Sequence, residues 1–433
     1  MEEKKRNNRI TIALIGIFVI LSFLVGVTYA YFAATAQSDT VTITSGRLEI
    51  VFTDGQLINA TNIEPINESD ILTKATKKSF SVAKASDSND MYARIDLTDL
   101  VVSNNFQDYD LKWALYEGST KITTGSFVTT SDGSDSINMA TNVLINSTTP
   151  KNYSLYIWIQ ETGVDQTNLV DGSLTGKITV TGEKNKLNTL ASKILSEIPQ
   201  TNPTFSTTST DKGLFVQKDD STKSNYGFPT YYFRGSVENN YVSFSGENFR
   251  IVRINEDGTI RLVGPMVYPD AWDDSSECMN NGECNLNFIG SNVEKEVKNW
   301  YSNYNLDSND LVIQNSEYCQ KEYSDFYSFY CPRNSVIIDK VALLSADEVG
   351  YSGALYEPDE MINSLTYLSS EYGDLWWTMT KNTPNGYIIW FWNNYLSTDS
   401  PMVDNSAMPV INLKPDVLVA SGNGTESSPY VIE

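Results

Sequence analysis

The chain has 433 residues, enough for about two or three domains, and its 40% hydrophobic content is that of a globular protein. The 54 Asp and Glu residues outnumber the 31 Lys and Arg residues and give a net charge of −23, which repels phosphate backbones, so we expect no nucleic-acid partner. The absence of histidine excludes Ser-His-Asp and Cys-His catalytic groups and histidine metal ligands.

The N-terminus carries a basic segment followed by an uncharged, apolar run over residues 10–27. Signal peptides usually contain ~7–15 apolar residues and membrane helices ~20, so two interpretations of residues 1–30 stay open. They are a signal peptide cleaved after Ala30, or an uncleaved membrane anchor. In both cases the preceding positive charge places the rest of the chain outside the cytoplasmic membrane. We therefore expect a secreted or cell-surface protein, held at the membrane by its N-terminal helix if the leader is retained.

Residues 31–183 are predicted to form an all-β sandwich. Short segments of alternating apolar and polar residues are separated by clusters of Gly, Asn, Asp and Ser, as in strands joined by turns. Trp113 and Trp158 are expected to pack in the core. Tyr156 and Trp158 alternate with Leu155 and Ile157, so both faces of their strand are expected to be covered. The predicted strands are Val41–Phe52 with a bend at Ser45-Gly46, Ser79–Ala85, Met91–Leu100, Asp110–Gly118, Tyr153–Glu161 and Ser173–Gly182.

The motif T-Y-A-Y-F at residues 28–32, followed by S-G-R-L-E-I at residues 45–50, resembles the TasA/camelysin family of secreted Gram-positive surface proteins. The later patterns K-x-F-x-V, Y-x-R-I-x-L and Y-x-L-Y-I-W-I-x-E are similar to distant members. The resemblance covers residues 10–183 and implies a jelly-roll-like sandwich processed by a dedicated signal peptidase. It also implies self-assembly by donor-strand addition, in which the mature segment Tyr31–Thr44 completes the sheet of another copy; its apolar alternation suits an exposed sheet edge.

Residues 184–212 are predicted to contain a helix and a linker. Apolar residues recur at helical spacing over Lys186–Ile198, and Pro199 ends the helix. The Thr- and Ser-rich stretch that follows is typical of a linker or a surface loop.

Residues 213–433 are predicted to form an α+β domain with a mainly antiparallel sheet. Two S-x-x-E capping boxes, Ser291–Glu294 and Ser345–Glu348, each open a helix, and the first helix is expected to bury Val293, Val297, Trp300 and Tyr301. The predicted hairpins are Tyr231–Phe244, turning at Glu238-Asn239-Asn240, and Phe249–Val263, turning at Asp257-Gly258 with Ile251, Ile254, Ile260 and Leu262 as apolar partners. The later predicted strands are Asp374–Lys381, Gly386–Leu396 and Ala407–Lys414.

The order of motifs in this half resembles an uncharacterised family of exported Gram-positive domains. It runs from Y-Y-F-R-G at residues 231–235 through F-R-I-V-R-I-N at residues 249–255 and W-W-T-M-T at residues 376–380 to M-P-V-I-N-L-K-P-D-V at residues 408–417. The pattern is similar to C-type-lectin-like and formylglycine-generating-enzyme-like folds. The resemblance implies a C-type-lectin-like domain and no particular activity.

All four cysteines lie in the second domain, and an even count in an exported chain predicts disulfides. Three pairings are open. We favour the sequential pairs Cys278–Cys284 and Cys319–Cys331, because each closes a polar loop. A zinc site built from the four thiolates is the alternative, although CxxC spacing is absent.

The loop Tyr268–Cys284 is rich in carboxylates, which are the ligands that calcium prefers. No other cofactor is expected. The candidate ligands are Asp270, Asp273, Asp274, Glu277 and Glu283, although a solvated acidic loop is the favoured interpretation. Glu357-Pro358-Asp359 and Trp392-Asn393-Asn394 resemble, with departures at the third residue of each, the E-P-N and W-N-D elements of calcium-dependent lectins.

Six of the eight tryptophans lie in the second half of the chain. If exposed, such a group stacks on sugar rings or anchors a protein partner; if buried, it forms a core, which is the favoured interpretation. The candidate ligand-binding residues are Trp376, Trp377, Tyr387, Trp390 and Trp392.

No nucleophile motif is present, so the leading hypothesis is a non-enzymatic extracellular surface or matrix protein. Its sandwich would serve assembly or display, and its C-terminal domain would bind an extracellular glycan or protein. The alternative is a secreted carbohydrate-active hydrolase that uses carboxylates of the C-terminal domain.

Overall fold

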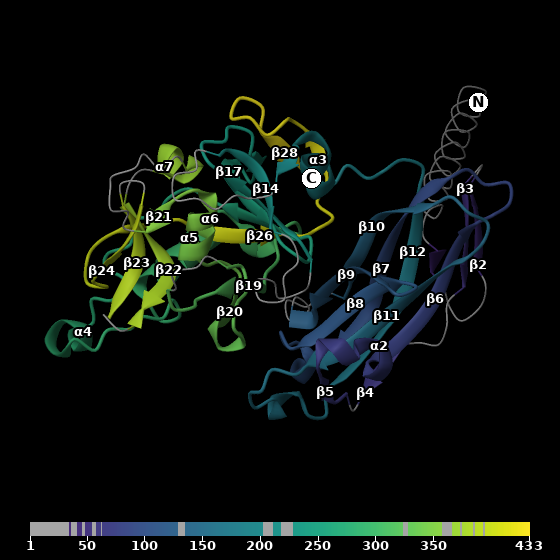
Figure 1. The fold of residues 1–433 in the computed structure, drawn as a ribbon, viewed down its shortest axis with the longest axis horizontal. Helices are drawn as coiled ribbons and strands as arrows, with labels where there is room; N and C mark the ends of the chain where they lie inside the picture. Colours follow the sequence, from purple (N-terminus) through teal and green to yellow (C-terminus); the bar gives the residue numbers. More distant parts are fainter. Residues whose placement is uncertain are drawn as a thin grey trace, which may run out of the picture. The chain divides into compact units, whose positions relative to one another are not determined.

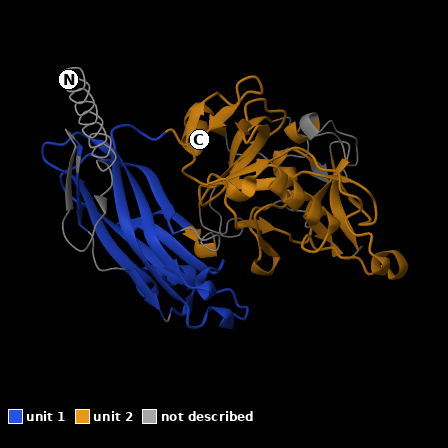
Figure 2. Cartoon of the chain, turned by 180° about the vertical axis from the view of Figure 1, so that it is seen from behind, with its two compact units in different colours: residues 1–124, 134–187 blue, residues 125–133, 188–433 orange. Residues whose placement is uncertain are grey.

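The computed structural model describes residues 34–35, 41–45, 48–53, 58–61, 63–128, 135–201, 211–217, 228–323, 328–356, 366–372, 375–383, 386–392 and 395–433. The predicted leader and Ala30 lie outside these ranges. Among the described helices, none is long and apolar enough to cross a membrane. The chain divides into two compact units, one of residues 1–124 and 134–187 and the other of residues 125–133 and 188–433 (Figure 2).

The first unit consists almost entirely of antiparallel strands in two sheets (Figure 1). One sheet has the order β1-β12-β7-β10, with β4 also paired to β12; the other has the order β2-β3-β6-β11-β8-β9, with β5 paired to β11. The first sheet comprises β1 (Ala34–Thr35), β4 (Ile58–Thr61), β7 (Met91–Val102), β10 (Ile137–Ile145) and β12 (Ser173–Glu183). The second comprises β2 (Val41–Ser45), β3 (Leu48–Thr53), β5 (Pro65–Ile66), β6 (Thr76–Lys84), β8 (Leu111–Glu117), β9 (Thr120–Ser126) and β11 (Lys151–Gln160).

The two sheets of this unit pack closely, as a β-sandwich requires. At Gly182 of β12, an added Cβ would lie 2.6 Å from Cδ1 of Ile50 on β3, so a larger residue would force the Ile50 side chain to shift. The outer face of the second sheet is covered as well: Tyr156 and Trp158 are buried against Ile71 of the short helix α2 (Ile71–Lys74). The expectation that both faces of β11 are covered is therefore confirmed.

The second unit contains a nine-stranded sheet, a five-stranded sheet and a two-stranded ribbon, β19-β20. The large sheet has the order β13-β14-β15-β17-β16-β28-β27, and β18 joins β17 to β26. Its strands are β13 (Gln200–Thr201), β14 (Gly213–Gln217), β15 (Thr230–Arg234), β16 (Tyr241–Phe244), β17 (Glu247–Ile254), β18 (Ile260–Val263), β26 (Val410–Leu413), β27 (Val419–Ser421) and β28 (Tyr430–Ile432). The others are β19 (Ser316–Cys319), β20 (Val336–Asp339), β21 (Leu355–Tyr356), β22 (Leu375–Asn382), β23 (Tyr387–Trp392), β24 (Tyr395–Asp399) and β25 (Ser406–Ala407).

One of the two predicted hairpins is wrong. β15 and β16 do not pair with each other; both pair antiparallel with β17, β15 near its end and β16 near its start, so they run in the same direction. The chain leaves the ladder between them at Gly235, whose φ of +78° favours glycine. The β17–β18 hairpin is confirmed, with Ile251 opposite Leu262 and Ile254 opposite Ile260.

Two predicted late strands also divide. The segment Gly386–Leu396 forms two antiparallel strands, β23 and β24, because the chain reverses between Trp392 and Tyr395, which are register partners. The segment Ala407–Lys414 contributes to two sheets, since β25 pairs with β22 and β26 pairs with β18. A run of apolar residues reports burial but not the point at which a buried chain turns.

The described helices of the second unit are α3 (Leu190–Glu197), α4 (Ser276–Asn281), α5 (Asn292–Asn303), α6 (Ala346–Ser352) and α7 (Tyr367–Tyr372), with 3₁₀ turns at Leu306–Ser308 and Arg333–Ser335. Four of them, α3, α4, α5 and α6, begin at a Ser or Thr whose side chain caps the N-terminus. Both predicted S-x-x-E starts are helix N-termini. α6 has a complete capping box, whereas Glu294 of α5 accepts from the backbone N–H of Gly290 instead of Ser291. The predicted buried side of α5 is confirmed.

Candidate functional site

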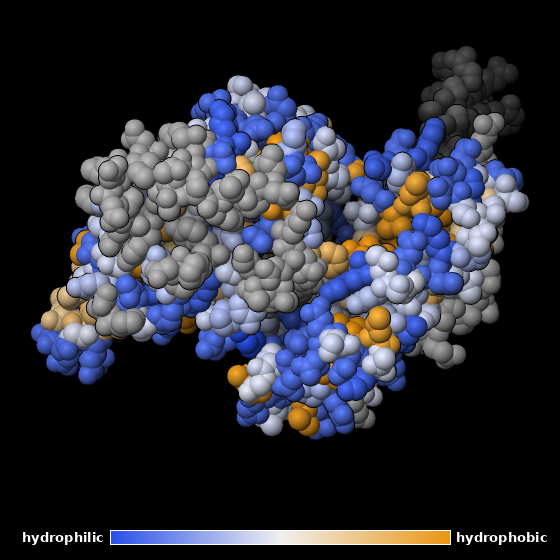
Figure 3. Space-filling model, in the orientation of Figure 1, coloured by the Kyte–Doolittle hydropathy of each residue, from blue (hydrophilic) through white to orange (hydrophobic). Residues whose placement is uncertain are grey.

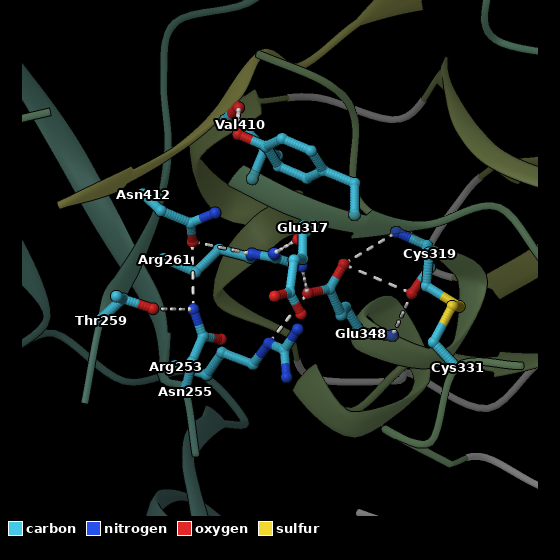
Figure 4. A network of polar contacts seen from close by, with 12 residues as sticks. Arg253, Asn255, Thr259, Arg261, Glu317, Cys319, Cys331, Glu348, Val410 and Asn412 are labelled. Carbon is cyan, nitrogen blue, oxygen red and sulfur yellow. Dashed lines mark hydrogen bonds and ion pairs between the residues drawn. A yellow bond between two sulfur atoms is a disulfide. The ribbon is translucent and has the colours of Figure 1, made fainter. Parts of the chain in front are cut away.

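A row of side chains crosses the large sheet of the second unit on one face. Register pairs join Phe215, Tyr232, Arg253, Arg261 and Asn412 on the neighbouring strands β14, β15, β17, β18 and β26. Residues opposite one another on adjacent strands share a face and lie within contact distance. The buried Arg261 and the half-buried Arg253 thus stand side by side (Figure 4).

A β-bulge in β17 makes this arrangement possible. Arg250 pairs with Val263 and Arg253 pairs with Arg261, with a register shift between Ile251 and Arg253. Val263 and Arg261 are two residues apart on β18 and therefore share a face, so Arg250 and Arg253 share it too. In a regular strand, residues three apart point to opposite faces. The bulge therefore directs both arginines of β17 toward the interior.

Helix α6 supplies the carboxylate that meets the arginines. Glu348 Oε1 accepts a 2.6 Å hydrogen bond from Arg261 Nη1 and a 3.0 Å bond from Arg253 Nε. Its other oxygen, Oε2, accepts from the backbone N–H of Ser345 at 2.9 Å and completes the capping box. One buried side chain therefore both starts the helix and fixes it to the sheet.

The remaining donors of Arg261 are also engaged. Arg261 Nε donates to Asn412 Oδ1 at 3.1 Å, and Nη2 donates to the Glu317 carbonyl at 2.6 Å. Asn412 Oδ1 further accepts from Asn255 Nδ2 at 3.1 Å. Satisfied donors of this kind are needed to keep a guanidinium in a low-dielectric interior.

Burial and mutual attraction shift the pKa values of this group. Burial alone would raise the pKa of Glu348, but Arg261 and then Arg253 outweigh it, and the pKa falls from 4.5 to about 2. Burial, followed by repulsion from Arg261, lowers the pKa of Arg253 from 12.5 to about 10, against the attraction of Glu348 and Glu256. Glu348 and Arg253 are therefore both charged at neutral pH.

An aromatic cluster adjoins the guanidinium of Arg253. The rings of Phe329 and Tyr351 are stacked with centroids 3.9 Å apart, and the Tyr232 ring lies 5.5 Å from Phe329 and 4.8 Å from Tyr351. Arg253 Cζ lies 4.7 Å from the centroid of Phe329, within the range of a cation–π contact. Phe329 belongs to the loop that the Cys319–Cys331 disulfide closes.

Two neighbouring carboxylates carry opposite pKa shifts, as acid–base pairs do. Glu348 titrates low, whereas burial raises the pKa of Asp347 against the attraction of Lys321. Asp347 Oδ1 accepts from the Ser328 N–H at 2.8 Å, and Oδ2 lies 3.1 Å from Lys321 Nζ. Because each of the four carboxylate oxygens already has a protein partner, the arrangement favours holding charge in place over proton transfer to a substrate.

The predicted disulfide pairs are confirmed: Cys278 bonds to Cys284 and Cys319 to Cys331. The two disulfides indicate an oxidising environment. They also leave none of the four thiols free, which overturns the zinc alternative.

The candidate aromatic residues separate into buried and exposed members. Trp376 and Trp377 are fully buried, and Trp377 packs edge-on against Trp272, so neither is placed to stack on a sugar ring. Trp390 is half-buried beside Trp377, and Tyr387 is 40% exposed. Trp392 is the last residue of β23, and Asn393, Asn394 and Glu357-Pro358-Asp359 lie outside the described residues.

The structure does not gather the five candidate calcium ligands. Within the described part of the chain, Asp273 is the only one of them in a group of three or more metal-ligand types, and the other members of that group are disulfide-bonded Cys278 and Cys284. The oxygens of Asp273 accept from the N–H groups of Ser275 and Asn285 and so fix the disulfide loop. Asp274 accepts from Asn292, while Asp270, Glu277 and Glu283 are exposed.

The triad of Arg253, Arg261 and Glu348 was not among the sequence-predicted site residues. Its signal is the presence of arginines inside apolar strands, in R-I-V-R-I and I-R-L, combined with a capping-box glutamate. Comparison of the chain with protein-family models, curated proteins and solved structures gave no match, so the two family resemblances stay predictions.

Proposed function

We propose that the chain is a non-enzymatic extracellular surface or matrix protein, secreted or held at the cell by a retained leader. The first unit serves assembly or display, and the second binds an extracellular glycan or protein. The disulfides support an extracellular location, and the occupied oxygens of Asp347 and Glu348 support binding over catalysis.

The observation that carries the assembly function is the position of the N-terminal segment. Among the described strands, β2 pairs with β3 and forms the edge of its sheet, and β1 pairs with β12 over two residues, Ala34 and Thr35. Strands held at an edge by backbone hydrogen bonds can be replaced by the same strands of another copy. Residues 31–45 therefore act as the exchanged segment, as the TasA-like resemblance implies.

The test compares chains that begin at residue 31 and at residue 46. The longer chain is expected to form protease-resistant filaments visible by electron microscopy, and the shorter chain to stay monomeric. A synthetic peptide of residues 31–45 should bind the shorter chain without restoring filaments. The peptide completes the sheet edge of one chain, but it is not attached to a sandwich to which a further chain could add. A longer chain that stays monomeric at every concentration would contradict the assembly function.

Binding by the second unit is tested with a glycan array and with immobilised surface proteins. The Tyr387 side chain is 40% exposed and can reach a ligand, so Tyr387→Ala is the first variant to measure. Steady product formation from a polysaccharide by the purified chain would overturn the non-enzymatic part of the proposal.

A further inference from the structure

We propose that Arg253 anchors a binding site for a single carboxylate group in the second unit. The inference deepens the binding function proposed above and rests on it. Its starting point is a guanidinium that the protein uses only in part.

Arg253 engages one of its three nitrogens. Nε donates to Glu348 Oε1 at 3.0 Å, and no hydrogen bond from Nη1 or Nη2 to any described residue is present (Figure 4). The neighbouring Arg261, by contrast, donates from Nε, Nη1 and Nη2. The Arg253 side chain keeps 13% of its surface exposed, whereas that of Arg261 keeps 3%. A planar fork of N–H donors matches a carboxylate in geometry.

A second donor without a partner lies beside it. Tyr232 is the register partner of Arg253 on β15 and is 1% exposed, and its hydroxyl is buried without a hydrogen-bond partner among the described groups. An unpaired buried hydroxyl is costly, and an acceptor between the two side chains would satisfy both. The ring of Phe329 contacts both side chains, with its centroid 5.5 Å from that of Tyr232 and 4.7 Å from Arg253 Cζ.

The local charge favours one negative group. Two guanidiniums share Glu348, which leaves an excess of one positive charge in the triad, and the half-buried Glu256 offsets part of it. The whole chain carries a net charge of −23, which disfavours polyanions such as phosphates. The arrangement therefore selects a monocarboxylate, supplied either by a sugar acid or by a peptide terminus.

The test is calorimetric titration of the full chain with galacturonate and with N-acetylglycine, using galactose and inorganic phosphate as comparison ligands. At least one carboxylate is expected to bind, and neither comparison ligand should bind as tightly. Binding of galacturonate alone identifies a sugar acid as the source of the carboxylate, and binding of N-acetylglycine alone identifies a peptide terminus. Binding of both identifies a general monocarboxylate site. Failure of both carboxylates, or equal binding of galactose or phosphate, overturns the proposal.

Variants locate the bound group. Arg253→Lys keeps the charge but loses the fork and should weaken binding about tenfold or more. Tyr232→Phe removes only the unpartnered hydroxyl and should weaken binding severalfold without lowering the melting temperature. Tyr301→Phe is the matched control, because its hydroxyl already donates to Leu306 and Gln314.

The two variants also separate this inference from the broader function. If Arg253→Lys does not fold, Tyr232→Phe decides, and unchanged carboxylate affinity in that folded variant overturns the site. If ligands found on the array still bind to Tyr232→Phe and Arg253→Lys, the second unit binds as proposed but elsewhere. Filament formation by the first unit is unaffected by either result.

Discussion

Replacing Glu348 by glutamine should destabilise the second unit strongly, because among the described residues Glu348 is the only carboxylate paired with both Arg253 and Arg261. The Glu348 side chain is 3% exposed and pairs with both arginines. Glutamine keeps the size and can still accept from Ser345, so the change isolates charge from shape and from capping.

Two independent estimates of the cost agree. A fall in the pKa from 4.5 to about 2 corresponds to about 3 kcal/mol at ~1.4 kcal/mol per unit. Breaking a buried ion pair by neutralising one partner typically costs ~3–5 kcal/mol. We therefore expect Glu348→Gln to lower the free energy of unfolding by about 3 kcal/mol.

The pH dependence has a definite sign. The folded pKa of Glu348 is lower than the unfolded value, so its contribution is complete above pH 4.5 and is lost as the pH falls toward about 2. The wild-type chain should lose stability across this interval more steeply than Glu348→Gln, which has no carboxylate to protonate.

The measurement is urea unfolding of the full chain followed by tryptophan fluorescence, since six of the eight tryptophans lie in the second half. Glu294→Gln is the matched control: it alters the same position of another S-x-x-E start, and Glu294 pairs with the part-exposed Lys298, so about 1 kcal/mol is expected. Equal losses in the two variants would refute the charge argument.

Three further outcomes are expected. Removing the Cys319–Cys331 disulfide by a double serine substitution should cost about 3 kcal/mol by loop entropy, measured without reductant as a lower urea midpoint than that of the wild-type chain. Trp158→Ala should cost ~3–5 kcal/mol by circular dichroism, whereas Val101→Ala, at a position 69% exposed, should be neutral; similar losses would contradict the packing of the outer face. Asn240→Ala should cost ~1–3 kcal/mol, because Arg250 Nε loses its acceptor, and an unchanged midpoint would count against it.

The sequence was sufficient for features that depend on neighbours along the chain. The strands β6, β7, β8, β11 and β12, the Asp257-Gly258 hairpin and the capped starts of α5 and α6 follow from alternation, turn residues and cap spacing, all local signals. The strands β9 and β10 were missed, and Val41–Phe52, expected as one bent strand, forms the antiparallel pair β2 and β3. The disulfide pairs followed from the polar loops that they close. The mostly β character of both units was predictable for the same reason.

Long-range pairing was not predictable in this way. β15 and β16 resembled a hairpin because both are apolar and a polar stretch separates them. Instead, β17 is longer than either strand and pairs with both of them. The triad escaped detection because it joins side chains of β17, β18 and α6, which are far apart in the sequence, and no local pattern predicts that they meet. The tryptophans were ambiguous because aromatic density alone does not separate a core from a binding face.

The double role of Glu348 has a consequence for how the second unit opens. A helix of seven residues is too short to persist alone, and the carboxylate that starts α6 is held by β17 and β18. Hydrogen exchange should therefore find the amides of α6 and those of the two strands opening together, at one common free energy, with no state in which the helix melts while the strands stay protected.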